Sequence, residues 1–182
     1  MHKALHWKTL NTATVVKDDW IHVVKHHVQL PNGMELKSYF GVDIPDWGAV
    51  FALTDNQKVV MIKQYRHGLD GVFYELPAGV IDDGEDPSEG CRRELLEEAG
   101  YGSENELQFL GKMNPSPAKF NNWNHVYLME GATKIQNQQL DQTEDIIVEL
   151  VPLNKVKDLI REGLVPDSFM VAAIYMALDE LS

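Results

Sequence analysis

The stretch of residues 79–101, GVIDDGEDPSEGCRRELLEEAGY, constrains the fold of this chain more than any other segment. Asp86 is a favourable helix N-cap, and Pro87 suits the first helical turn because it needs no backbone N–H there. Gly100 is a common helix terminator, since glycine adopts the left-handed conformation at low cost. The sequence therefore predicts a helix over residues 87–99, close to the usual helix length.

Acidic side chains crowd one side of this helix. At roughly 100° per residue, Glu94, Glu97 and Glu98 share one arc. The neighbouring arc carries small or apolar residues that we expect to face a core: Cys91, Leu95, Leu96 and Ala99. A solvated helix face, the ordinary explanation of a charged run, would interleave Lys four residues away, and none is there. The crowding therefore indicates a hard divalent cation, Mg²⁺ or Mn²⁺, held by oxygen ligands.

The spacing of the segment resembles the Nudix box. Gly79 is followed after five residues by Glu85, and after seven more by the run RELLEEAG. Tyr101 takes the last position, where an aliphatic residue is usual. The resemblance implies a strand, a loop and a helix that bind Mg²⁺ against a diphosphate. It also implies an enzyme that hydrolyses a nucleoside diphosphate linked to another moiety.

The same resemblance assigns roles to individual positions. Glu94, Glu97 and Glu98 match the metal ligands, and Ala78 would add its backbone carbonyl. Arg93 and Glu85 match a pair that holds the loop against the helix in the catalytic centre.

Segments outside the box resemble one subgroup, the ADP-ribose and nucleoside-diphosphate-sugar pyrophosphatases. The matching segments are Glu75–Gly79 (ELPAG), Gln64–Arg66 (QYR) and Pro117, which follows Tyr101 by sixteen residues. Ala118 replaces the glycine that often follows this proline, and asparagines stand where an acidic residue is expected. The substrate is therefore open between ADP-ribose and another nucleoside-diphosphate sugar, such as a GDP-sugar.

Five residues are candidates for substrate binding: Arg66, Glu75, Trp20, Trp47 and Pro117. The Arg66 guanidinium suits bidentate binding of phosphate oxygens, although a surface arginine is an equally ordinary explanation. The tryptophans are candidates to stack on the base, but each is more often a core or interface residue.

A general base is expected from outside the box, because the box carboxylates would be occupied by metal. The segment DQTED, residues 141–145, precedes a predicted strand, as a loop closing over substrate would. The resemblance implies a glutamate there, which favours Glu144 with Asp141 in reserve. Gln142 is excluded because an amide does not take a proton from water. An exposed acidic turn is the alternative.

The predicted elements fit an α/β fold, namely an α/β/α sandwich around a mixed sheet, as the Nudix resemblance also implies. Predicted strands lie at residues 48–53, 59–66, 73–76, 107–113, 126–129 and 146–151, with helices at 154–161 and from Asp167 to about Leu181. Two further strands, 20–30 and 34–42, flank the turn Pro31–Gly33 as an antiparallel hairpin. We therefore predict an N-terminal β subdomain over residues 1–45 that dimerises, and a hydrolase domain over residues 46–182.

Composition narrows the classes of partner. A net charge of −12 over 182 residues argues against binding nucleic acid. The single cysteine, Cys91, excludes an intrachain disulfide. No apolar leader and no run long enough for a membrane span is apparent, which predicts a cytoplasmic protein. Two rival functions remain, a nucleoside triphosphate pyrophosphohydrolase and a non-catalytic sensor of ADP-ribose.

Overall fold

The computed structural model describes residues 5–18 and 21–182, and these divide into two compact units. One unit is Met1–Pro45 with Asn114–Asn122, and the other is Asp46–Met113 with Trp123–Ser182. The segment Asn114–Asn122 thus clusters with the N-terminal unit, although the predicted boundary at residue 45 places it in the second domain. It contains Pro117.

The N-terminal unit is built on a three-stranded antiparallel sheet in the order β1–β2–β3. Its strands are β1 (Lys8–Lys17), β2 (His22–Gln29) and β3 (Glu35–Asp43). β2 and β3 form the predicted hairpin, and Gly33 takes a positive φ of 86° in its turn. β1 was not predicted, and it pairs with β2 along its length. Every residue of β1 is exposed.

The second unit contains a mixed sheet with the order β12–β5–β4–β10–β9, to which β6 adds beside β5 and β7 beside β4. β4 and β10 are parallel, and the other pairs are antiparallel. The strands are β4 (Trp47–Leu53), β5 (Lys58–Arg66), β6 (Gly71–Glu75), β7 (Ala78–Val80), β9 (Gln108–Met113), β10 (Asn124–Glu130) and β12 (Ile146–Pro152). A separate two-stranded sheet joins β8 (Tyr101–Gly102) to β11 (Thr133–Lys134).

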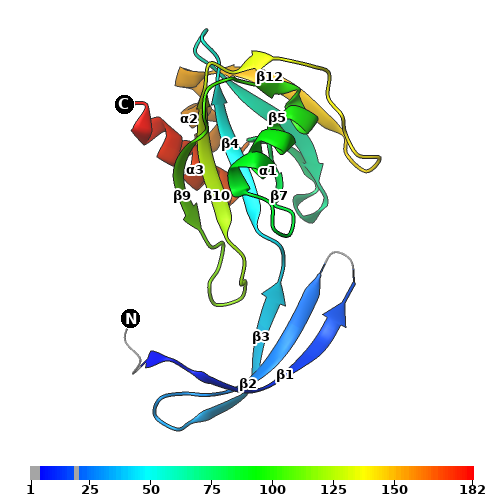
Figure 1. Ribbon diagram of the computed structural model, residues 1–182, viewed down its shortest axis with the longest axis vertical. Helices are drawn as coiled ribbons and strands as arrows, with labels where there is room; N and C mark the ends of the chain where they lie inside the picture. Colours follow the sequence, from blue (N-terminus) through cyan, green and yellow to red (C-terminus); the bar gives the residue numbers. More distant parts are fainter. Residues whose placement is uncertain (1–4, 19–20) are drawn as a thin grey trace. The chain divides into compact units, whose positions relative to one another are not determined.

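Helices cover both faces of this sheet (Figure 1). They are α1 (Pro87–Glu94), the π-helix η3 (Leu95–Ala99), α2 (Val156–Arg161) and α3 (Ser168–Glu180), with 3₁₀ turns η2 (His67–Leu69) and η4 (Leu153–Lys155). Along β4, Ala49, Phe51 and Leu53 pack in one buried cluster with α3, whereas Val50 and Ala52 pack in another with α1 and η3. This alternation across a strand confirms the α/β/α sandwich.

Two details of the helices differ from the prediction. The helix of residues 87–99 begins at its predicted cap, where Asp86 accepts a hydrogen bond from the Ser88 N–H at 2.9 Å, but its last turn is a π-helix. As a result Leu96 is only partly buried, whereas Glu98 is buried. On α3, Tyr175 was expected to dock on the core and is instead exposed, while Met170, Ile174 and Ala177 are buried.

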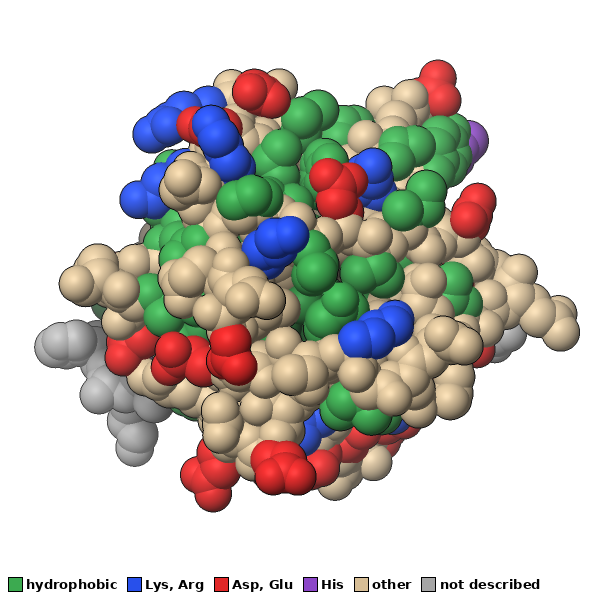
Figure 2. Space-filling view, turned by 90° about the horizontal axis from the view of Figure 1, so that it is seen from above, with side chains coloured by type: hydrophobic (Ala, Val, Ile, Leu, Met, Phe, Trp, Pro, Cys, Tyr) green, Lys and Arg blue, Asp and Glu red, His purple; other side chains and the backbone are tan. Residues whose placement is uncertain are grey.

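The surface carries mixed charge. On the face shown in Figure 2, Lys and Arg side chains lie interspersed with Asp and Glu side chains. Among the described helices, none is both long and apolar enough to cross a bilayer. The predicted cytoplasmic location and the predicted absence of nucleic-acid partners stay predictions.

Candidate active site

The site forms where the central sheet forks. β4 pairs with β5 only at Ala52 and Leu53, and its first three residues pair instead with β7. The outer half of β5 pairs with β6. The segment that joins β6 to β7, Leu76–Pro77, therefore lies in the fork, and the Pro77 carbonyl accepts a hydrogen bond from the Val50 N–H at 3.0 Å.

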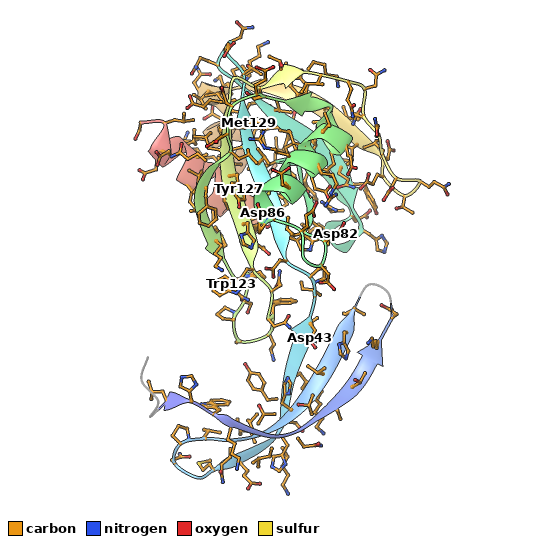
Figure 3. The ribbon with its side chains drawn as sticks, viewed as in Figure 1. Asp43, Asp82, Asp86, Trp123, Tyr127 and Met129 are labelled. Atoms are coloured by element: carbon orange, nitrogen blue, oxygen red, sulfur yellow. The ribbon has the colours of Figure 1, made fainter. Side chains whose placement is uncertain are left out.

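α1 and η3 lie against this fork through Cys91, Leu95 and Ala99, which are fully buried. Figure 3 labels Asp82 and Asp86 in the loop before α1, and Tyr127 and Met129 on β10, whose side chains belong to the same buried cluster. Burial raises the pKa of the Cys91 thiol to about 12. A protonated, inaccessible thiol is a core residue and not a nucleophile.

Glu98 is the most enclosed of the box carboxylates, with a residue exposure of 4%. Its Oε2 atom accepts a hydrogen bond from the Ala78 backbone N–H at 2.8 Å. Burial raises the pKa of Glu98 to about 8, the Ala78 hydrogen bond opposes that rise, and the charges of Glu94 and Glu144 add to it. The charged form of Glu98 is therefore costly in this protein without a cation, because the carboxyl is desolvated and lies near other carboxylates.

Glu94 occupies space that a side chain on β7 would otherwise fill. A Cβ atom built on Gly79 would lie 2.1 Å from the Glu94 carboxyl carbon, so only glycine fits beside this carboxylate. Burial also raises the pKa of Glu94, and its hydrogen bond from Arg93 opposes that rise. The third carboxylate, Glu97, is more exposed, with a side-chain exposure of 40%.

Arg93 connects the loop, β7 and the carboxylates. Its Nε and Nη2 atoms bind the two Glu85 carboxylate oxygens at 3.1 and 3.0 Å, and Nη2 also donates to the Val80 carbonyl at 2.9 Å. Its Nη1 atom donates to Glu94 at 2.7 Å and to Glu97 at 3.3 Å. The Glu85 hydrogen bond is the main reason that the pKa of Arg93 is raised, so the guanidinium is permanently charged. The structure thus brings Arg93 and Glu85 together in a bidentate pair.

The residues present fit a hard divalent cation. Glu94, Glu97 and Glu98 supply only oxygen donors, and a buried carboxylate such as that of Glu98 is normally paired or bound to metal. Within the described residues, no three His, Cys, Asp or Glu side chains already converge in a geometry that would hold an ion. Arg93 and the Ala78 N–H take up the carboxylate oxygens instead. Ala78 lies next to Glu98, and the role of its carbonyl stays a prediction.

Of the predicted substrate contacts, Arg66 and Glu75 lie beside this cluster. Arg66 ends β5, and its Nε and Nη2 atoms bind both carboxylate oxygens of Glu75, which is 4% exposed. The charges of Glu75 and Glu98 raise the pKa of Arg66, after the larger contribution of the Glu75 hydrogen bond. The structure thus engages Arg66 with a carboxylate, and its predicted contact with phosphate stays a prediction.

The other candidates are dispersed. Trp47 is the first residue of β4 and is partly buried. Its backbone N–H donates to the Trp123 carbonyl at 2.9 Å. Pro117 is exposed in the N-terminal unit, and Trp20 lies outside the described residues. The roles of all three stay predictions.

Glu144 lies close enough to the cluster for its charge to raise the pKa of both Glu94 and Glu98. It is partly buried, whereas Asp141 is exposed. The two residues close a turn in which the Asp141 N–H donates to Glu144 Oε2 and the Glu144 N–H donates to the Asp141 carbonyl, both at 3.0 Å. The charge interactions and partial burial therefore favour Glu144 over Asp141, and its role as the base stays a prediction.

The sequence did not predict which residues donate hydrogen bonds to the carbonyls at the end of the box helix. The carbonyls of Glu97, Glu98, Ala99 and Gly100 all accept hydrogen bonds from residues 134–139. No local motif marks that polar segment. Its glutamines and lysine had no assigned role.

Comparison with known proteins finds two protein families that match segments of this chain. The NUDIX domain family matches residues 45–170, and the family described as the nucleoside diphosphate sugar hydrolase N-terminal domain matches residues 7–40. A methanol dehydrogenase activator of Bacillus methanolicus is 34% identical over 99% of this chain and 97% of its own length. An ADP-ribose pyrophosphatase of Bacillus subtilis is 33% identical over 98% of this chain and 96% of its own length.

The fold is also shared with a solved structure. The crystal structure of an ADP compounds hydrolase superposes with a TM-score of 0.86, covering 98% of this chain and 96% of that one, at 23% identity.

Proposed function

Because this chain belongs to the Nudix hydrolase family, we propose that it cleaves the diphosphate bond of ADP-ribose or a related nucleoside-diphosphate sugar. The products are a nucleoside monophosphate and a sugar phosphate. The observation that supports this most is the carboxylate cluster of Glu94, Glu97 and Glu98 beside β7, joined by the charge of Glu144. The names of the Bacillus subtilis relative and of the superposing structure agree with a substrate of this class.

Nudix hydrolases use a divalent metal ion, and we propose Mg²⁺, with Mn²⁺ as a substitute. Glu94, Glu97 and Glu98 would hold it, with the Ala78 carbonyl. Such an ion supplies charge neutralisation on the diphosphate and activation of water.

The chain's own residues perform the remaining tasks. Arg93 keeps Glu94 and Glu97 together on the helix while its pair with Glu85 fixes the preceding loop. Arg66, held in plane by Glu75, presents its remaining donor edge to a phosphate oxygen. Glu144 takes the proton from the attacking water, since it is the partly buried carboxylate of the loop. Trp47, Trp20 and Pro117 are proposed contacts of the nucleoside part.

Hydrolysis of a substrate panel tests the proposal. ADP-ribose, GDP-mannose, UDP-glucose, NADH and nucleoside triphosphates are each incubated with enzyme and Mg²⁺, and the products are identified by chromatography and mass. We expect a nucleoside monophosphate and a sugar phosphate from one or more of the sugar substrates. Pyrophosphate released from a triphosphate, with the sugar substrates intact, would establish the rival activity instead. Binding of ADP-ribose without turnover would establish the sensor.

A further inference from the structure

The carbonyl groups at the end of the π-helix η3 accept hydrogen bonds from one segment of the chain. Residues 134–139, here called the strap, run from β11 past the end of η3. The Glu97 carbonyl accepts from the Gln139 N–H at 2.8 Å, and the Ala99 carbonyl accepts from Lys134 Nζ at 2.8 Å. The Gly100 carbonyl accepts from the Ile135 and Gln136 N–H groups at 2.9 and 3.2 Å. The carbonyls that a helix end leaves without partners are thus satisfied by the strap.

The Gln138 side chain joins the helix end to a second element through hydrogen bonds. Its Nε2 atom donates to the Glu98 carbonyl at 2.7 Å and to the Ile146 carbonyl at 3.0 Å. A glutamine amide nitrogen has two hydrogens, so both donors are used. Because both neighbours are carbonyl oxygens, only the nitrogen end of the amide can face them.

These two carbonyls belong to the two parts of the site. Glu98 is the buried carboxylate residue of the cluster, and its backbone lies in the π turn. Ile146 is the first residue of β12, directly after the loop that carries Glu144. Gln138 precedes that loop and Ile146 follows it. The hydrogen bond from the Gln138 side chain to the Ile146 carbonyl therefore joins the two ends of the loop. One amide therefore fixes the backbone of Glu98 and the end of the Glu144 loop at once.

We propose that Gln138 is a positioning residue that sets the register of the π turn and the base of the Glu144 loop together. It acts on the carboxylates only through their backbone and touches neither substrate nor metal. π turns are rare within α-helices and recur at functional sites. This inference rests on the proposed hydrolytic function, because the carboxylates it positions are those of the proposed site.

The test compares Gln138→Met with Gln139→Met. Methionine approximates the shape of glutamine but donates no hydrogen bond. Gln139 is the matched control, because its side chain is exposed and its contact with Glu97 is made by the backbone N–H. Gln138→Glu and Gln139→Glu form a second pair, should the Met variants fold poorly. Circular dichroism verifies folding of all four.

Two readouts are expected to move only in the Gln138 variants. Hydrogen exchange of the metal-free protein in the peptides covering residues 95–100 and 139–146 should quicken on the order of ten- to thirty-fold, the factor implied by two lost hydrogen bonds. The Mg²⁺ concentration giving half-maximal turnover should rise about ten- to a hundred-fold, as for other outer partners of metal ligands. KM for substrate at saturating Mg²⁺ should change little.

Equal exchange in the two Met variants, with equal Mg²⁺ dependence, would overturn the inference. Should the wild type hydrolyse nothing in the panel, the proposed function fails. Hydrogen exchange and calorimetric Mg²⁺ binding then still decide the role of Gln138, because neither needs turnover.

Discussion

Glu98 is the most enclosed of the three carboxylates proposed to hold the metal ion. Its carboxylate is buried, receives the Ala78 N–H and lies near the charges of Glu94 and Glu144. Glu98→Gln keeps an oxygen for the Ala78 N–H and removes the charge. We expect turnover with Mg²⁺ to fall at least about 100-fold, more than loss of an outer partner of a metal ligand costs.

The same variant should not lose stability, because burial raises the pKa of this carboxyl and so costs folding free energy that a neutral amide does not incur. Thermal unfolding without metal checks this, and a melting temperature equal to or above that of the wild type is expected. Glu89→Gln is the control, since Glu89 is an exposed residue of the same helix. Near-normal turnover of Glu98→Gln would contradict the assignment of the metal site.

Gly79 provides a steric test of the same site. A methyl group at this position would collide with the Glu94 carboxylate, so Gly79→Ala should displace Glu94 and raise the Mg²⁺ requirement about tenfold or more. Activity against Mg²⁺ concentration is the measurement. Gly68→Ala is the matched control, because a Cβ atom there meets nothing within 4 Å. If both alanine variants show the wild-type dependence of activity on Mg²⁺ concentration, the close approach of Glu94 to β7 does not matter for metal binding.

At the scale of elements, the loop after the strap carries the proposed base. Glu144→Gln should lower kcat at least about 100-fold with a small change in KM, because a general base acts mainly in the transition state. The amide oxygen can still accept the Asp141 N–H, so the turn is retained. Asp141→Asn is the matched control and should remain near wild type. If Asp141→Asn loses activity while Glu144→Gln stays active, the base is Asp141 and not Glu144. If both variants stay active, the loop has no chemical role.

The sequence predicted elements well where a local signal exists. The cap at Asp86 and the stop at Gly100, whose φ is +68°, bounded the helix of the box correctly. The π turn was not foreseen, because it depends on the strap, which lies about forty residues further along the chain. A fixed 100° periodicity therefore placed Leu96 in the core and left Glu98 outside it, whereas Leu96 is only partly buried and Glu98 is buried.

Other errors have similar causes. β1 was missed because its segment KTLNTATVVK mixes polar and apolar residues without alternation, although its threonines and valines favour strands. Tyr175 was assigned to the docked face of α3, whose apolar residues occur all around the helix. Tertiary contacts then decide which of them are buried.

The site divides in the same way. The box motif identified Glu94, Glu97, Glu98, Arg93 and Glu85, and the structure places all of them in one region. The bidentate pair of Arg66 with Glu75 and the double contact of Gln138 depend on the fork in the sheet and on the strap. Such non-local contacts leave no pattern in one sequence.

At the scale of the whole molecule, the N-terminal unit leaves several large apolar side chains exposed. Exposed fractions are 47% for Trp7, 51% for Val15, 48% for Val16 and 41% for Phe40. An exposed ten-residue edge strand also offers unpaired backbone groups to another chain. We therefore predict a homodimer formed through this unit.

Sedimentation velocity at micromolar concentration checks the prediction, and a dimer is expected. Val15→Glu should shift the population toward monomer, because it puts a charge in the predicted interface. Ile147→Glu is the control, since Ile147 is equally exposed on β12 of the other unit, with an exposed fraction of 58%. A fully active wild-type monomer would rule the dimer out.

The central claim is that the box carboxylates support metal-dependent cleavage of a diphosphate. Phosphorus NMR follows this directly, with ADP-ribose and GDP-mannose as substrates, Mg²⁺ or a chelator present, and wild type compared with Glu98→Gln. We expect the diphosphate resonances of at least one substrate to be replaced by two phosphomonoester resonances only with wild type and Mg²⁺. Persistence of both diphosphates, or equal cleavage with the chelator or with Glu98→Gln, would contradict the account.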